Sequence, residues 1–251
     1  MSGHSKWAGI KHKKAIVDAK RAVSFTKVAR EVTIAAKEGG GNPDGNFRLR
    51  LAIQKAREAN MPADKIRGAV DRGTGATAGD NLEELRYEGY GPAGVAILVD
   101  AVTDNRNRTS AALKHIFAKH GGNLGESNSV AYLFDRMGVI EVNAKGRDPD
   151  DLSLAAIEAG AEDISVDGDS LEVTAGPSEF EAVRAALEEA GAKIENSDLT
   201  MHPKTSVPVG EDKAPAVLRL MEALEDDDDV QQVYANFDIP ADVLERVSAS
   251  V

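Results

Sequence analysis

The spacing of apolar residues changes once along this chain of 251 residues, at the glycine-rich stretch 73–79 (GTGATAG). Before that stretch, apolar residues recur every three or four positions, which is the period of an amphipathic helix. After it, runs such as 94–102 (GVAILVDAV) and 138–144 (GVIEVNA) have the apolar pattern of strands, with helical segments between them. The sequence therefore predicts a helical N-terminal part followed by mixed α and β structure.

Three helices are expected before the change of period. The first covers residues 14–38 and ends at three glycines, the second follows NPDGN (42–46) and reaches Asn60, and the third runs from about Pro62 to Arg72. The stretch 73–79 lacks the spacing of a dinucleotide-binding loop and follows a helix, so we interpret it as a linker.

The order of elements after the linker predicts two α/β domains. Strands are expected at 82–91 and 94–102, followed by a helix at 109–121, which is a ββα unit that lacks a closing strand. A βαββαβ order typical of a ferredoxin-like domain then covers about 138–203. A late helix (216–224) and strand (230–237) would complete the earlier unit.

The predicted fold class is therefore α+β and multidomain: a basic N-terminal domain of the three-helix type precedes two α/β sandwich domains, one of them ferredoxin-like and inserted in the other. The predicted boundaries are 1–78 for the helical domain, 79–135 plus 206–240 for the discontinuous α/β domain, 136–205 for the inserted ferredoxin-like domain and 241–251 for a C-terminal tail.

Charge is divided at the same place as the apolar period. Residues 1–73 hold 16 Lys and Arg against 7 Asp and Glu, a net charge of +9, and residues 74–251 hold 14 against 35, a net charge of −21. A whole domain with this excess of cations is typical of a phosphate-binding surface, although each helix taken alone could simply have a solvated basic face.

The cations of the first helix include three lysines spaced by seven residues, Lys13, Lys20 and Lys27, which a helical wheel places within roughly 40° of one another. We predict that they contact nucleic acid together with residues of the preceding arm and the next two helices. The predicted nucleic-acid-binding residues are Lys6, Trp7, Lys11, His12, Lys13, Lys14, Lys20, Arg21, Lys27, Arg48, Arg50, Lys55, Arg57, Arg106 and Arg108. Lys65, Arg67 and Arg72 supply further positive charge.

Two of these predictions have competing interpretations. Trp7, the only Trp, could anchor the arm to the helical core or could stack on an exposed base, which would favour single-stranded or looped RNA over duplex DNA. Residues 104–109 (DNRNRT) could be a capped helix start with two solvated arginines, or an edge where Arg106, Asn107 and Arg108 meet phosphate or a partner.

Several functional classes are disfavoured. The chain has no cysteine, which excludes disulfides and thiolate metal sites, and no apolar run long enough for a membrane span. Its five histidines lack metal-ligand spacing, its serines lack a nucleophile elbow, and the acidic run 225–229 is interpreted as a solvated turn. We expect no enzyme activity, cofactor, metal or small-molecule substrate. With no secretion signal we expect a cytoplasmic protein, although a basic start also suits organelle import.

Long stretches of the chain resemble the YebC/PmpR family, which has a mitochondrial relative that activates translation of cytochrome oxidase. The resemblance is carried by residues 1–21, 25–75, 87–109 and 230–239, among them FTKVAREVTIAAKEGGGNPDGN, YEGYGPAGVAILVDAVTDNRNRT and VQQVYANFDI. It implies a helical domain followed by two α/β domains. It also implies either DNA-binding transcriptional regulation or assistance to the translating ribosome, and the fold does not choose between these roles.

Three hypotheses for function follow. The favoured one is a non-enzymatic, DNA-binding regulator of transcription that uses the basic helical domain, with the acidic α/β domains contacting a protein partner. The second is a translation factor that binds ribosomal RNA through the same cations. The third is a protein-interaction scaffold without nucleic acid.

Overall fold

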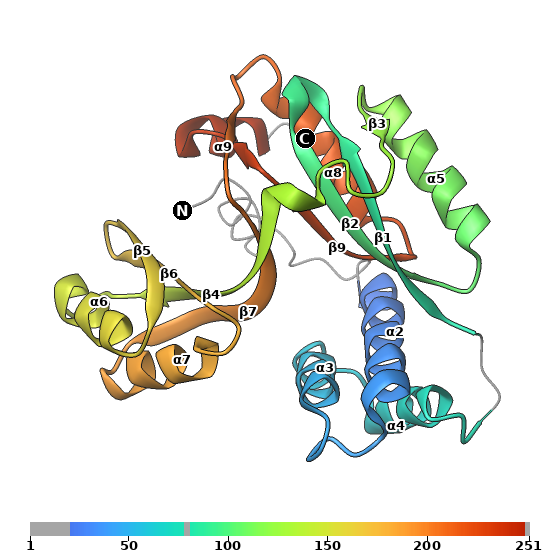
Figure 1. Ribbon diagram of the computed structural model, residues 1–251, viewed down its shortest axis with the longest axis horizontal. Coiled ribbons are helices and arrows are strands. Elements are labelled where there is room, and N and C mark those ends of the chain that lie inside the picture. Colours follow the sequence, from blue (N-terminus) through green and yellow to red (C-terminus); the bar gives the residue numbers. More distant parts are fainter. Residues whose placement is uncertain (1–20, 78–80, 249–251) are drawn as a thin grey trace. The chain divides into compact units, whose positions relative to one another are not determined.

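The computed structural model describes residues 21–77 and 81–248 (Figure 1). These residues form two compact units, one of which contains Tyr132–Ser206 and the other the described residues before and after that segment. Both units combine helices with antiparallel strand pairs. The predicted α+β class is therefore confirmed.

Helices α2 (Arg21–Gly39), α3 (Phe47–Glu58) and α4 (Ala63–Gly73) pack around a small apolar core that includes Val32, Leu49 and Ile66. The side chain of Asn46 caps α3 by accepting from the N–H of Leu49 at 3.0 Å, and its amide donates to the carbonyl of Ala35 in α2 at 2.7 Å. This buried amide fixes the turn between the first two helices.

Helix α4 approaches α2 closely. A Cβ atom at Gly73 would lie 2.3 Å from the carbonyl oxygen of Thr33, so only glycine fits at this crossing. The Thr33 hydroxyl also donates to the carbonyl of Ala69 at 3.1 Å. Residue type at the end of α4 thus sets how near the two helices can lie.

The same unit contains a sheet of order β3-β1-β2-β9. Its strands are β1 (Glu83–Tyr90), β2 (Ala96–Thr103), β3 (Asn123–Leu124) and β9 (Val230–Ala235). Strand β2 pairs antiparallel with β1 and with β9, although β9 follows it by more than a hundred residues. A 3-10 turn, η2 (Pro92–Gly94), joins β1 to β2.

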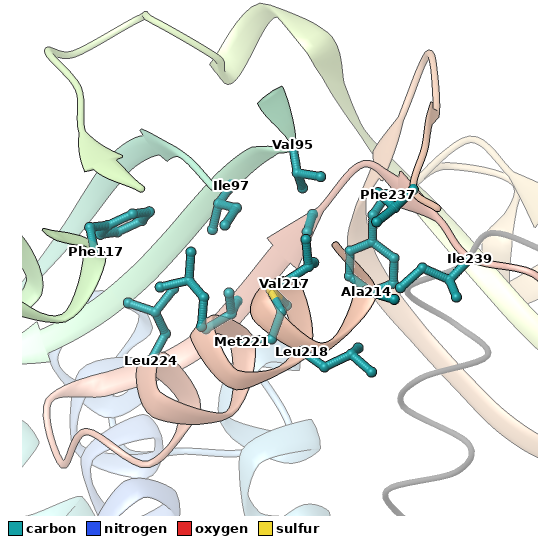
Figure 2. Packing of buried hydrophobic residues seen from close by; sticks show 14 of the residues in the cluster. Val95, Ile97, Phe117, Ala214, Val217, Leu218, Met221, Leu224, Phe237 and Ile239 are labelled. Carbon is teal, nitrogen blue, oxygen red and sulfur yellow. The ribbon is translucent and has the colours of Figure 1, made fainter. Parts of the chain in front are cut away.

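Helices α5 (Arg106–Lys119) and α8 (Ala214–Glu225) contribute to the core of this sheet. Figure 2 shows Val217, Met221 and Leu224 of α8 beside Ile97 and Phe117. The predicted helices at 109–121 and 216–224 are confirmed, each beginning two or three residues earlier than expected.

The C-terminal prediction needs correction. Residues 241–251 were expected to be a tail, but Ala241–Ser248 forms helix α9, whose Val243, Leu244 and Val247 are buried in the same core. A short parallel pair, β8 (Val207–Pro208) with β10 (Phe237–Asp238), was also not predicted. Strands of two residues, such as β8 and β10, are too short for their apolar residues to show a period.

The unit of residues 132–206 is a sheet of order β5-β6-β4-β7. It consists of β4 (Phe134–Asn143), β5 (Ala161–Asp167), β6 (Ser170–Ala175) and β7 (Lys193–Pro203), with 3-10 turn η3 (Ala131–Leu133) at its start. Helices α6 (Pro149–Glu158) and α7 (Phe180–Glu189) bury Leu152, Val183 and Leu187 in its core. Every predicted element of this segment is confirmed.

None of the described helices is long and apolar enough to cross a membrane.

Candidate nucleic-acid interface

Two cations of helix α2, Lys27 and Arg30, contact the end of helix α8 and the loop after it. The ammonium group of Lys27 donates to the carbonyl of Glu225, and the guanidinium of Arg30 donates to the carbonyl of Asp228. Arg30 also pairs with the carboxylate of Asp229 at 3.0 Å. Because a helix C-terminus presents unpaired carbonyls, it is a favourable place for cations.

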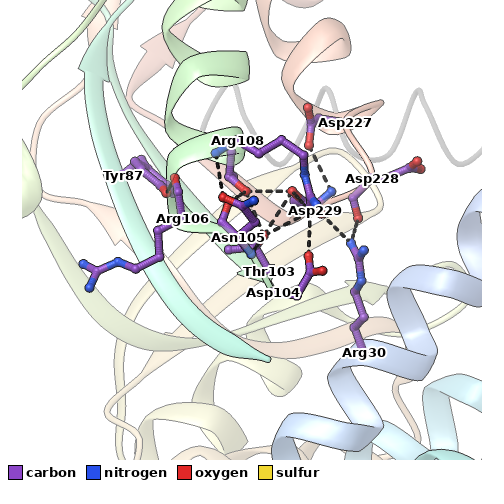
Figure 3. A network of polar contacts seen from close by, with 11 residues as sticks. Arg30, Tyr87, Thr103, Asp104, Asn105, Arg106, Arg108, Asp227, Asp228 and Asp229 are labelled. Atoms are coloured by element: carbon purple, nitrogen blue, oxygen red, sulfur yellow. Dashed lines mark hydrogen bonds and ion pairs between the residues drawn. The ribbon is translucent and has the colours of Figure 1, made fainter. Parts of the chain in front are cut away.

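Asp229 is the centre of this network (Figure 3). Its side chain is only 8% exposed and accepts from Arg108 at 2.9 Å and from the hydroxyls of Thr109 at 2.6 Å and Thr103 at 3.2 Å, in addition to Arg30. One carboxylate therefore joins helix α2, the end of strand β2 and the start of helix α5.

The environment of Asp229 favours its charged form. Burial alone would raise the pKa of the carboxyl group, but the hydrogen bonds from Thr109 and Arg108 and the charges of Arg30 and Arg108 outweigh burial and hold the pKa below its usual range. The interpretation of 225–229 as a solvated turn is thus wrong for Asp229, although Asp226 and Asp228 are exposed. From the sequence alone, the five successive acidic residues 225–229 cannot be distinguished, so the burial of Asp229 could not be predicted.

The motif 104–109 forms the capped helix start that was one of its two interpretations. The side chain of Asn105 caps α5 by accepting from the N–H of Arg108 at 3.1 Å. The guanidinium of Arg108 bridges Asp104 at 2.7 Å and Asp229, while Arg106 is exposed, 3.9 Å from the carboxylate of Glu83. The positive charge of Arg108 is therefore neutralised by two carboxylates of the protein itself.

Helix α3 carries two pairs of cations with seven-residue spacing, and they have different surroundings. Arg48 makes a two-bond contact with Glu84, at 3.0 and 2.9 Å, and also pairs with Glu38 at 2.6 Å. Lys55, on the same side of α3, lies 3.7 Å from Glu31. This side of the helix faces carboxylates of the protein itself.

The other pair of α3 is open to solvent, as are three cations of α4. Within the described part of the chain these five residues are exposed and make no ion pair: Arg50, Arg57, Lys65, Arg67 and Arg72. Lys65 and Arg72 are themselves seven residues apart, so they share one side of α4. Helices α3 and α4 thus present five exposed cations that no carboxylate of a described residue pairs with.

Phe47 is an unexpected member of this surface. It is 41% exposed, and the guanidinium of Arg50 lies 5.4 Å from the centre of its ring. Such an arginine and aromatic pair can stack on a base. The sequence does contain a signal for Phe47, because a helical wheel places it roughly 160° away from the apolar stripe of its helix.

A cavity of about 790 Å³ lies beside α4. Phe25 and Met61 give it apolar walls, Lys65 and Arg72 contribute two of the open cations, and the Arg30–Asp229 pair also lines it. Among the described residues, no group of three His, Asp or Glu side chains could hold a metal ion.

Several predicted site residues lie outside the described part of the chain: Lys6, Trp7, Lys11, His12, Lys13, Lys14 and Lys20. Arg21 is the first residue of α2. Of the three lysines spaced by seven, only Lys27 is described, and its ammonium group contacts the carbonyl of Glu225.

We predict that Asp229→Asn lowers the free energy of unfolding by about 2–3 kcal/mol at neutral pH, because two arginines lose a buried anion. The folded pKa of Asp229 is depressed, so this stabilisation is complete above the unfolded pKa of about 4 and is lost as pH falls through the folded value. Urea unfolding at neutral pH and near pH 3 measures the change, and the difference between the two proteins should shrink in acid.

Asp228→Asn is the matched control, because its carboxylate is exposed and only its backbone carbonyl accepts from Arg30. Equal stability of the two Asn variants at neutral pH would contradict the role assigned to Asp229.

Sequence comparisons agree with this architecture. Residues 5–76 match the family described as TACO1/YebC protein N-terminal domain, and residues 82–237 match the family described as TACO1/YebC second and third domain. Similar curated relatives include proteins of Rubrobacter xylanophilus, 54% identical over 250 residues, and Dictyoglomus thermophilum, 53% identical over 249 residues. Each alignment covers 99% of this chain and 100% of the relative, and both relatives are named "Probable transcriptional regulatory protein".

A solved structure is similar as well. The crystal structure of a conserved hypothetical protein from Aquifex aeolicus is 47% identical, with a TM-score of 0.79, over 90% of this chain and 93% of that one. The two family matches cover most of the chain, and the resemblance to YebC/PmpR proteins is confirmed. This chain belongs to the TACO1/YebC family.

Proposed function

We propose that this chain is a non-enzymatic, cytoplasmic regulator of gene expression that binds DNA through its basic helical domain. The observation that carries the proposal is the set of five exposed cations on α3 and α4 that make no ion pair with any described residue. The names of the curated relatives, which describe probable transcriptional regulators, support the same role.

In this proposal Arg50, Arg57, Lys65 and Arg72 make the first contacts with phosphate, because they need not release an internal partner. The predicted contacts outside the described residues, from Lys6 to Lys20, and that of Arg21 are further phosphate contacts in this proposal. Four other predicted contacts have internal partners, so they bind phosphate only by exchanging them: Lys27, Arg48, Lys55 and Arg108. Arg106 is open enough to contact phosphate directly.

The test replaces the open cations in pairs, as Arg50→Ala with Arg57→Ala and as Lys65→Ala with Arg72→Ala. Each pair should weaken binding of a duplex at least about tenfold at low salt and reduce the slope of log affinity against log salt by about 1.8, since each phosphate contact contributes about 0.9. Fluorescence anisotropy with one labelled duplex across a salt series measures both quantities.

Lys114→Ala with Lys119→Ala is the matched control, because it removes the same charge from exposed positions of α5. If this variant loses as much affinity as the others, net charge alone governs binding and α3 and α4 are not the interface.

A second candidate is a translation factor that binds ribosomal RNA. The exposed Phe47 beside Arg50 favours it, because aromatic and arginine stacking suits unpaired bases. Phe47→Ala should then weaken binding of single-stranded RNA about tenfold or more and leave duplex DNA within about twofold. Equal effects on both polymers would remove the support that Phe47 gives to this candidate.

The duplex itself should be bound with little sequence discrimination. This expectation comes from the first helix, where the cations spaced by seven residues are lysines, which carry a point charge and lack the planar fork of arginine. In α3 the amide of Gln54 pairs with Glu58. We therefore expect unrelated duplexes to bind within about tenfold of any proposed promoter. A preference of about a thousandfold for one duplex would contradict this expectation.

We further propose that the described unit 132–206 is a ferredoxin-like domain inserted in a discontinuous α/β domain. Its strand order β5-β6-β4-β7 and the pairing of β9 with β2 support this. A fragment of 132–206 should then melt cooperatively on its own, whereas 81–131 should not, because it lacks β9 and α8. A cooperative melt of the second fragment would contradict the insertion.

A further inference from the structure

The outer side of helix α6 is apolar. Leu154 is 57% exposed and Ile157 is 59% exposed, and their spacing of three places them side by side on the helix surface. The inner side of the same helix already supplies Leu152 and Ala156 to the core. Helix α6 therefore has two apolar sides: one packs in the core, and the other is exposed.

Helix α7, in the same unit, shows what a solvated outer side looks like. Its Arg184 pairs with Glu181 at 2.9 Å and with Glu188 at 3.2 Å, as expected for a helix that faces water. The two helices cover the same sheet, so packing does not explain why only α6 exposes large apolar side chains.

Strand β5, which contacts α6, exposes a further apolar side chain. It follows α6 directly, contacts it, and lies at one edge of its sheet. Val166 of β5 is 52% exposed. Of the five large apolar side chains that are exposed in the described part of the chain, three belong to this α6–β5 face, which we define as Leu154, Ile157, Val166 and the acidic residues around them.

The charges around these side chains determine what can cover them. Residues 148–169 contain no Lys or Arg and eight exposed carboxylates: Asp148, Asp150, Asp151, Glu158, Glu162, Asp163, Asp167 and Asp169. Along α6, Asp150 and Asp151 precede the apolar pair and Glu158 follows it. Nucleic acid and anionic membranes are repelled by such a surface, whereas a basic partner is attracted.

We propose that the α6–β5 face binds a Lys/Arg-rich amphipathic helix of a protein partner. The apolar side chains of that helix cover Leu154, Ile157 and Val166, and its cations meet the carboxylates at both ends of α6. The proposal does not depend on nucleic-acid binding, since it uses other residues and the opposite charge.

The test uses the full chain and a labelled helical peptide of about 18 residues, built from leucine at helical spacing and lysine elsewhere. A second peptide has the same composition with its leucines dispersed. Two variants remove the two features of the face: Leu154→Ser with Ile157→Ser, and Asp150→Asn with Asp151→Asn and Glu158→Gln. Fluorescence anisotropy measures the affinity of each peptide, and circular dichroism checks that each variant melts like the wild type.

Two matched controls change other surfaces. Tyr132→Ser removes another exposed large side chain, and Glu211→Gln with Asp212→Asn and Asp238→Asn removes three exposed carboxylates elsewhere. Both variants of the α6–β5 face should weaken the amphipathic peptide about tenfold or more, and both controls should stay within about twofold. The dispersed peptide should bind at least about tenfold more weakly than the amphipathic one.

Three results would overturn the proposal. Unchanged affinity in the Leu154→Ser, Ile157→Ser variant would mean that cations bind the acidic surface without a site. Self-association of the wild type that this variant abolishes, seen by sedimentation velocity, would mean that a second copy covers the face. Loss of duplex binding in the same variant would assign the face to nucleic acid.

Discussion

A single buried carboxylate, that of Asp229, connects the helical and the α/β parts of the larger unit. An ionised carboxylate with so little exposure would be costly without partners, and Asp229 has four, two of them arginines from different helices. Its backbone carbonyl also accepts from the N–H of Val102 at 2.8 Å, which ties the residue to strand β2. The positions of α2, β2 and α5 around this point are therefore interdependent, and the cavity beside α4 has this network as one of its walls.

The apolar period was sufficient to predict most of the elements because each long strand or helix buries one side. Apolar and polar residues do not alternate along strand β2, so its sequence does not indicate one buried face. Its continuous apolar run Val95–Val99 instead correctly indicates that both faces are buried. Val243, Leu244 and Val247 have helical spacing, yet helix α9 was not predicted. The helix has only eight residues, and three apolar positions in so short a segment are a weak signal. The pairing of β8 with β10 depends on contacts between distant segments and leaves no local pattern.

The candidate site was predictable in charge but not in geometry. Counting charges identified a basic domain, but it could not separate Arg50 and Arg57 from Arg48 and Lys55 on the same helix. The difference arises from Glu31, Glu38 and Glu84, which tertiary packing brings to one side of α3. Asp229 was hidden for the same reason: among five successive acids, the structure selects one by burial, and burial is a property of the fold.

Internal pairing also changes what the charge division means for binding. Part of the +9 of residues 1–73 is neutralised by the protein's own carboxylates, and five cations on α3 and α4 have no ion pair with a described residue. The α6–β5 face shows the opposite case, because no Lys or Arg in its segment offsets eight carboxylates. The two proposals therefore assign ligands of opposite charge to the two surfaces. In the two proposals α3 and α4 attract a phosphate polymer and the carboxylates of α6 and β5 repel one, so the partner proposed for the α6–β5 face is chemically different from nucleic acid.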